Sequence, residues 1–127
     1  MQVESYWREI EAAWGLLDSD GVMNVLHLPG ANDAEVLALR ARGRLLAIEL
    51  GGVQMYPGFQ FDYESGLVKP VVADLVKLAH EVNWAHDDFV VWLCSPCGYF
   101  NGDRPVDHLH EHDDLLEKAR NAATVEW

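Results

Sequence analysis

The sequence predicts a mainly α-helical fold, a small helical domain with one β-hairpin in its N-terminal half. Apolar residues recur at spacings of three and four along most of the chain, which is the period of an amphipathic helix. Around Gly51-Gly52 the pattern changes to two short apolar runs, which is typical of a hairpin. With 127 residues, half of them hydrophobic, the chain is long enough to bury a core without disulfides.

The first helix is expected from Glu4 to Leu17. Its apolar residues are three or four positions apart and therefore share one face. They are Trp7, Ile10, Trp14 and Leu17. This face is most simply part of the core, and the alternative is that part of it lines a homodimer interface.

Two shorter helices should follow. The first begins at Asp18-Ser19-Asp20, which supplies candidate N-caps, and ends at Pro29-Gly30. The second covers residues 34–42, with Asp33 as its cap and Gly43 just after its end. The apolar residues expected to face inward are Val22, Val25, Leu26, Val36 and Leu37.

The hairpin strands flank Gly51-Gly52, and the second strand should end at Pro57, because proline cannot donate to a ladder. Phe59, Phe61 and Tyr63 then alternate with polar residues. This alternation predicts an extended segment with its aromatic side chains on one side.

Turn residues cluster between Asp62 and Lys69. They divide the chain into residues 1–62, a helix-turn-helix-like part with the hairpin, and a helical part over residues 63–127. The helices expected in the second part are Pro70 to Asn83, Asp87 or Asp88 to Leu93, one starting at Pro105, and Asp113 to Ala123. The acidic pairs Asp87-Asp88 and Asp113-Asp114 are expected to be N-caps.

The chain carries 9 basic and 21 acidic side chains, a formal net charge of −12. Such a field repels nucleic-acid phosphates and attracts a basic partner surface. The first residues do not form a basic and apolar leader, and no apolar run is long enough to span a membrane, so we expect a cytoplasmic protein. In that compartment the two cysteines should be free thiols.

A spaced motif of apolar residues, prolines and a glycine occupies the C-terminal half. Its members are Trp92-Leu93, Pro96, Phe100, Gly102, Pro105 and Leu109, followed by an acidic helix. In physical terms, Trp92 anchors one helix and Pro96 ends it. Gly102 turns the chain, and Pro105 starts the next helix. Over residues 68–123 the chain resembles the toxin-binding domain of Xre/MbcA/ParS-type antitoxins. Residues 43–47 and 56–62 are also similar to a subgroup of this family, in which the hairpin resembles a degenerate DNA-binding wing.

The resemblance implies a type II antitoxin that binds and neutralises a RES-domain toxin, of a family that consumes NAD or uses it for ADP-ribosylation. It implies a binding protein and not an enzyme, with no cofactor. In such complexes the C-terminal part is the inhibitory element. By position, the implied toxin-binding residues are Arg104, His108, Val125 and Trp127. The alternative place for Trp127 is folded back over the first helix.

Arg40, Arg42 and Arg44 form the only basic cluster in the sequence. On a helix-turn-helix-like unit they are candidate DNA-binding residues that contact phosphates beside the hairpin. The alternative is that they stabilise a helix C-terminus, where the dipole favours cations. Residues 1–62 hold four basic and nine acidic residues, which argues against DNA binding. A stand-alone DNA-binding transcriptional regulator is therefore the alternative function.

Four residues have a spacing close to that of a zinc finger, so a small zinc-binding domain is a further alternative. They are Cys94, Cys97, His108 and His112. Pro96 lies between the cysteines, and the intervening segment lacks the apolar core of a finger. Solvated histidines and half-buried thiols are therefore the favoured interpretation. The sequence contains no recognisable nucleophile with a paired base and no glycine-rich phosphate loop, so it does not indicate an enzyme.

Overall fold

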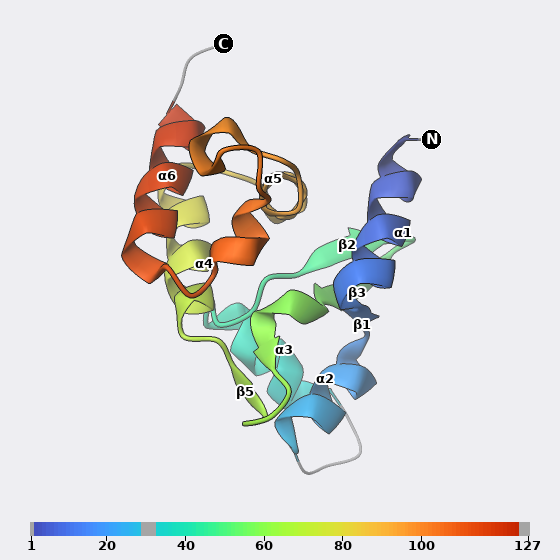
Figure 1. Ribbon diagram of the computed structural model, residues 1–127. Helices are drawn as coiled ribbons and strands as arrows, with labels where there is room; N and C mark the ends of the chain where they lie inside the picture. The colour runs from blue at the N-terminus through green and yellow to red at the C-terminus, as the bar shows by residue number, and fades with distance from the viewer. Residues whose placement is uncertain (1, 29–32, 125–127) are drawn as a thin grey trace.

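The computed structural model describes residues 2–28 and 33–124, and its architecture is mainly helical with a small antiparallel sheet (Figure 1). The α-helices of these residues are α1 (Gln2–Trp14), α2 (Ser19–Leu26), α3 (Ala34–Ala41), α4 (Val71–Glu81), α5 (His86–Leu93) and α6 (His112–Thr124). The strands are β1 (Leu16–Leu17), β2 (Ile48–Leu50), β3 (Val53–Pro57), β4 (Phe61–Asp62) and β5 (Leu67–Val68). The 3-10 helices are η1 (Gly58–Gln60), η2 (Gly98–Phe100) and η3 (Pro105–His108). The predicted fold class is confirmed as mainly α with a small sheet.

The predicted hairpin is present, and a third strand joins it. β2 and β3 pair antiparallel through Gly51-Gly52, whose φ values of 60° and 80° suit a type I′ turn. β1 pairs with the other edge of β3, with Leu17 opposite Tyr56, so the strand order is β1-β3-β2. β1 was not predicted, because a strand of two residues shows no alternation.

α1 ends at Trp14, so the expectation of a helix to Leu17 is wrong. Gly15 has a φ of 87°, and its N–H donates to the carbonyl of Glu11 at 2.9 Å, which ends the helix. Leu17 then lies in β1, although its spacing fits the helical stripe. Trp7 is 5% exposed and belongs to the core, as does Ile10, which confirms the core interpretation for these two residues.

α2 begins as expected, but it ends before the predicted stop at Pro29-Gly30. Asp18 is its N-cap, with Oδ1 accepting the N–H of Gly21 at 2.8 Å. The helix ends at Leu26, and His27 follows in the left-handed region with a φ of 54°. The expected stop at Pro29-Gly30 lies outside the described residues.

α3 buries one apolar side chain where two were expected. Val36 is fully buried, but Leu37 is 46% exposed, so the inward placement of Leu37 is wrong. Successive residues of a helix are rotated by about 100°, and a helix this short turns one narrow face to the core. Gly43 follows the helix with a φ of 71°, as expected of a residue after a helix end.

The segment from Phe59 to Tyr63 is not uniformly extended, as was expected, because it begins with the 3-10 turn η1. Phe59 packs in the larger core and Phe61 in the smaller one, while Tyr63 is 57% exposed. The three aromatic residues therefore do not share one side. The turn Ser65-Gly66 then leads β4 back onto β5, with Phe61 opposite Val68.

α4, α5 and α6 begin and end within two residues of the expected positions. Pro105 starts a helix as predicted, but the helix is of the 3-10 type. The N-cap of α5 is Ala85, so the N-cap role expected of Asp87-Asp88 is wrong. Both carboxylates lie in the first turn instead, where the helix dipole favours them. Asp113-Asp114 lie in the first turn of α6, which begins at His112, so the N-cap role expected of this pair is wrong too.

Two clusters of buried side chains hold the elements together. The larger cluster joins Ile10 of α1 and Ile48 of β2 to the apolar faces of α4, α5 and α6. The smaller cluster, which includes Val36 and Tyr56, belongs to the first part of the chain. The expected boundary near residue 62 falls at the β4–β5 turn, while the larger core is shared across it.

Within the described ranges, no helix combines the length and the apolar character needed to cross a membrane.

Candidate protein-binding groove and basic cleft

The motif residues enclose a tightly folded segment between α5 and η3. The Cys97 N–H donates to the carbonyl of Asp103, and the Gly102 N–H donates to the carbonyl of Cys97, both at 3.0 Å. Gly102 has a φ of 91°, a conformation that other residues rarely adopt. Trp92 lies in the last turn of α5 and Pro105 in the first turn of η3. The helix end after Trp92, the turn at Gly102 and the helix start at Pro105 that the motif predicts are therefore present.

A row of rings runs through this half of the protein. Ring centroids are 5.5 Å apart for Trp84 and Trp92, 6.5 Å for Trp92 and Phe100, and 4.7 Å for Phe100 and His108. Tilted and edge-on contacts of this kind stabilise a core beyond the burial of apolar area. Trp92 is thus held between the rings of Trp84 and Phe100, and His108 is the last ring of the row.

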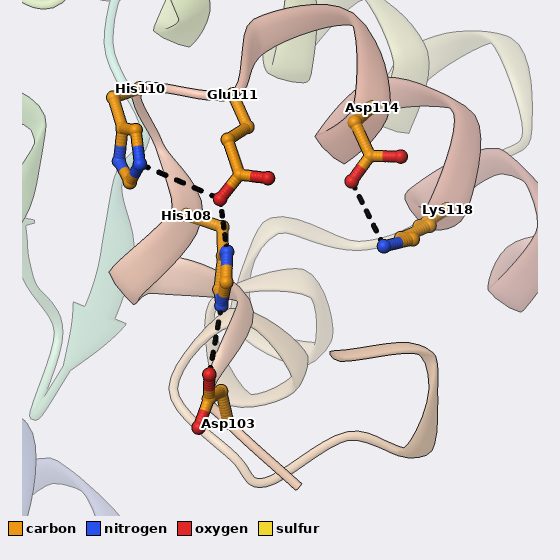
Figure 2. Close-up of polar contacts among 6 residues, drawn as sticks. All are labelled: Asp103, His108, His110, Glu111, Asp114 and Lys118. Carbon is orange, nitrogen blue, oxygen red and sulfur yellow. Dashed lines mark hydrogen bonds and ion pairs between the residues drawn. The ribbon is translucent and has the colours of Figure 1, made fainter. Parts of the chain in front are cut away.

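His108 lies between two carboxylates (Figure 2). Its Nδ1 contacts Glu111, and its Nε2 lies 3.1 Å from Oδ2 of Asp103. The hydrogen bond with Glu111, followed by the bond with Asp103, raises the pKa of His108 above its ordinary value of 6.5. His110 approaches the same Glu111 carboxylate at 3.5 Å. His108 thus connects the η2–η3 segment to Glu111, the residue that precedes α6.

Arg104 contacts the N-terminal part of the chain. Its guanidinium carbon lies 5.6 Å from the ring centroid of Trp14 in α1, a cation–π contact. The structure therefore places Arg104 and His108, both expected to bind a toxin, on the same segment, each in contact with side chains of this chain. The other two expected residues, Val125 and Trp127, lie outside the described residues.

An open groove of ≈ 780 Å³ lies beside the motif. Its walls come from the residues after α4, from α5, from η2 and from the end of α6, and the residues that define it are Trp84, Trp92, Pro96, Tyr99, Ala122 and Ala123. Tyr99 is 43% exposed although it is aromatic. No charged side chain among the described residues lines this groove, which we call the apolar groove.

The three arginines expected to bind DNA are exposed at the end of α3 and in the segment that follows it. Together with Lys77 they line a cleft of ≈ 960 Å³ against α4, and two of them line an adjoining hollow of ≈ 380 Å³ with Lys69. We call the two hollows the basic cleft, and its cations are Arg40, Arg42, Arg44, Lys69 and Lys77. His86 also lines it, and burial, followed by the charge of Arg40, lowers the pKa of His86.

The residues of the zinc alternative do not form a ligand set. In the described part of the chain, no group of three or more His, Cys, Asp or Glu side chains has the geometry to hold a metal ion. The Nε2 atom of His112 instead lies 2.6 Å from Oδ2 of Asp74. Both thiols are free, and burial raises the pKa of Cys94 to about 12, so this thiol is an unreactive part of the core.

Four residues of these two surfaces were missed in the sequence, namely Trp84, Tyr99, Lys69 and Lys77. Trp84 and Tyr99 lie outside the regular helices, where spacing carries no information about exposure. Lys69 and Lys77 are far from the arginines in the chain, and only the packing of α4 brings them together. No local pattern could have placed these four residues on the two surfaces.

No protein-family model matches the chain, and no curated protein matches it. Its fold is similar to that of a solved structure described as "NMR structure of Rv2175c", with a TM-score of 0.73. The two share 22% sequence identity, over 87% of this chain and 82% of that chain. At this identity the similarity shows a common fold.

Proposed function

We propose that the protein is an antitoxin of a type II toxin-antitoxin system that binds and neutralises a RES-domain toxin. The motif from Trp92 to Leu109 supports this function through its resemblance to Xre/MbcA/ParS-type antitoxins. The structural observation that carries it is the apolar groove, which opens directly beside that motif. Toxins of this family consume NAD or use it for ADP-ribosylation, and the antitoxin acts by covering the toxin's active site.

The apolar groove has the chemistry of a protein-binding surface. Trp84, Trp92 and Tyr99 supply aromatic side chains, which dominate the binding energy of protein interfaces. Since the described residues of its lining carry no charge, burying them against a partner does not require the desolvation of a charge. The net charge of −12 on the chain as a whole attracts a basic partner surface toward it.

Co-expression with a RES-domain toxin encoded beside this chain tests the function. The wild-type protein should abolish toxicity and co-purify with the toxin. Tyr99→Ser should weaken the complex by about tenfold, the loss typical of a hot-spot residue. Tyr63→Ser is the matched control, because Tyr63 is an exposed tyrosine outside the groove. Persistent toxicity without complex formation by the wild-type protein contradicts the antitoxin function.

A second candidate function, a DNA-binding transcriptional regulator, is favoured by the order of the elements. The chain runs α1-β1-α2-α3-β2-β3, with sheet order β1-β3-β2. This is the arrangement of a winged helix, in which α3 is the helix that enters the major groove and the β2–β3 turn is the wing.

The surfaces that such a regulator presents to DNA carry little positive charge here. Arg40 is the one cation in α3 and the β2–β3 hairpin, and exposed Glu35 and Glu49 oppose it. Because DNA binding depends on positive charge at the phosphate backbone, we place the regulator function after the antitoxin function. Retardation of the protein's own promoter fragment, lost on changing Arg40, Arg42 and Arg44 to Gln while toxin neutralisation is kept, would favour the regulator.

A further inference from the structure

The basic cleft collects five of the nine Lys and Arg side chains of the chain on one surface. Arg42 and Arg44 line both hollows, so the hollows adjoin one another. The three arginines come from α3 and the residues after it, whereas Lys69 precedes α4 and Lys77 lies within it. Figure 1 shows the segment that follows α3 passing beside the start of α4. Folding brings the two lysines beside the three arginines.

In the described residues, the exposed carboxylate of Asp62 interacts electrostatically with one cation of the basic cleft, Lys69. None of the five takes part in an ion pair there. The acidic residue in the lining, Asp74, is held by His112, with 2.6 Å between Oδ2 and Nε2. Of the four cations outside the cleft, Lys118 pairs with Asp114 at 2.9 Å and Arg120 with Glu81 at 3.2 Å, whereas Arg8 and Arg104 form no ion pair in the described residues. In a chain with 21 acidic residues, five cations without an ion pair indicate that the cleft attracts an external anion.

Stabilisation of α3 explains only part of this cluster. Arg40 lies in the last turn of α3 and Arg42 is its C-cap, where the helix dipole favours cations. That effect fades within one turn, so it does not account for Arg44 or Lys77. Lys69 precedes the first turn of α4, where the dipole opposes a cation. Like charges on one surface repel one another, and a bound anion would offset that repulsion.

We propose that the basic cleft is a binding site for phosphate groups, carried by a free diphosphate-bearing ligand or by a nucleic-acid backbone. Arginine side chains match phosphate oxygens with two parallel hydrogen bonds, and lysines add point charges. Trp84 and His86 in the wall of the larger hollow offer rings against which the organic part of a ligand can pack. The site does not depend on the antitoxin function, because the basic cleft and the apolar groove share only Asn83 and Trp84 among their described lining residues.

Titration of the full chain, followed by amide NMR signals at low ionic strength, tests the site with two probes, pyrophosphate and a short DNA duplex. Binding should shift the signals of residues 42–44 and 73–77. Arg42→Gln/Arg44→Gln should lower affinity by about tenfold or more, because charge-assisted hydrogen bonds are lost. Arg8→Gln/Arg120→Gln is the control with the same change in net charge, and it should bind within about threefold of the wild type.

Saturable shifts with pyrophosphate identify a free ligand as the source of the phosphate. Shifts with the duplex alone identify a nucleic-acid backbone, with a salt slope that falls by about 0.9 for each lost phosphate contact. Lys69→Gln/Lys77→Gln repeats the test from the opposite wall, and circular dichroism verifies that each variant is folded. Absence of shifts with both probes overturns the proposal, as does an equal loss of affinity in the Arg8→Gln/Arg120→Gln control.

Discussion

The Gln60 side chain pairs with the Leu46 backbone as a neighbouring strand would. Its Oε1 accepts the N–H of Leu46 at 2.8 Å, and its Nε2 donates to the carbonyl of Leu46 at 2.9 Å. Nε2 also donates to the carbonyl of Pro57 at 3.0 Å. Gln60 is fully buried, so these bonds satisfy main-chain groups that water does not reach. This one amide connects the segment before β2 to the end of β3.

We expect Gln60→Met to lower the free energy of unfolding by about 2 to 5 kcal/mol, because methionine keeps the volume but leaves buried main-chain groups of Leu46 unpaired. Urea denaturation measures the change. Tyr56→Phe is the control, since the buried Tyr56 hydroxyl has no hydrogen-bond partner in the described structure. Its removal should leave stability equal or higher. A loss below about 1 kcal/mol in Gln60→Met contradicts this role of the amide.

Gly58→Ala should destabilise the protein by about 3 kcal/mol or more, because its Cβ would lie 2.0 Å from the carbonyl oxygen of Trp14. The obstacle is main chain, and the Gly58 N–H already bonds to the carbonyl of Gly15 at 2.8 Å, so neither side can easily move. Thermal denaturation compares it with Gly98→Ala, whose Cβ meets nothing within 4 Å. The control should change stability by less than about 0.5 kcal/mol. Equal melting temperatures would show that the contact is relieved elsewhere.

His108 should make stability depend on pH. Its pKa is raised in the folded protein by Glu111 and Asp103, so its contribution is fully present below the unfolded pKa, near 6.5. The contribution is lost as the pH rises through the folded pKa. The stability difference between wild type and His108→Gln should therefore be larger at about pH 5.5 than at about pH 8.5. His80→Gln is the control, because His80 is exposed and forms no ion pair in the described residues. A difference for His108→Gln that is the same at both pH values would exclude this linkage.

The two thiols should react at different rates. Cys94 is buried and its pKa is raised to about 12, so a thiol reagent at about pH 8 should not modify it in the folded protein. Cys97 is half-buried and should be modified first. Counting modified thiols by mass spectrometry should give one in the native chain and two in urea. Modification of folded Cys97→Ser at the wild-type rate would mean that Cys94 is accessible.

Regular helices were predictable from the sequence because their apolar spacing is repeated over several turns, as in α4 and α6. The type I′ turn at Gly51-Gly52 was predictable because few other residues accept two positive φ values. β1 and η1 were not, since each has three residues or fewer and depends on contacts with distant segments. Leu37 shows the same limit, because a helix pattern shows which residues are apolar but not which of them a neighbour covers.

The candidate surfaces also combine features that the sequence predicts with features that depend on packing. The motif around Trp92 was visible because its prolines and glycine each impose a backbone conformation. The apolar groove and the lysines of the basic cleft depend on which elements pack together, and no spacing along the chain encodes that. Gln60 is a further example, because a lone glutamine in a sequence does not reveal that it is buried.

Trp84 borders both the apolar groove and the basic cleft. A protein segment in one and a phosphate ligand in the other would both contact a single indole, whose ring centroid lies 4.6 Å from that of Phe89 with an interplanar angle of 31°. If either occupant shifts that ring, the affinities of the two must be coupled, and by the same factor in each direction. On the proposed function, a small anion would then be an effector of a protein–protein complex.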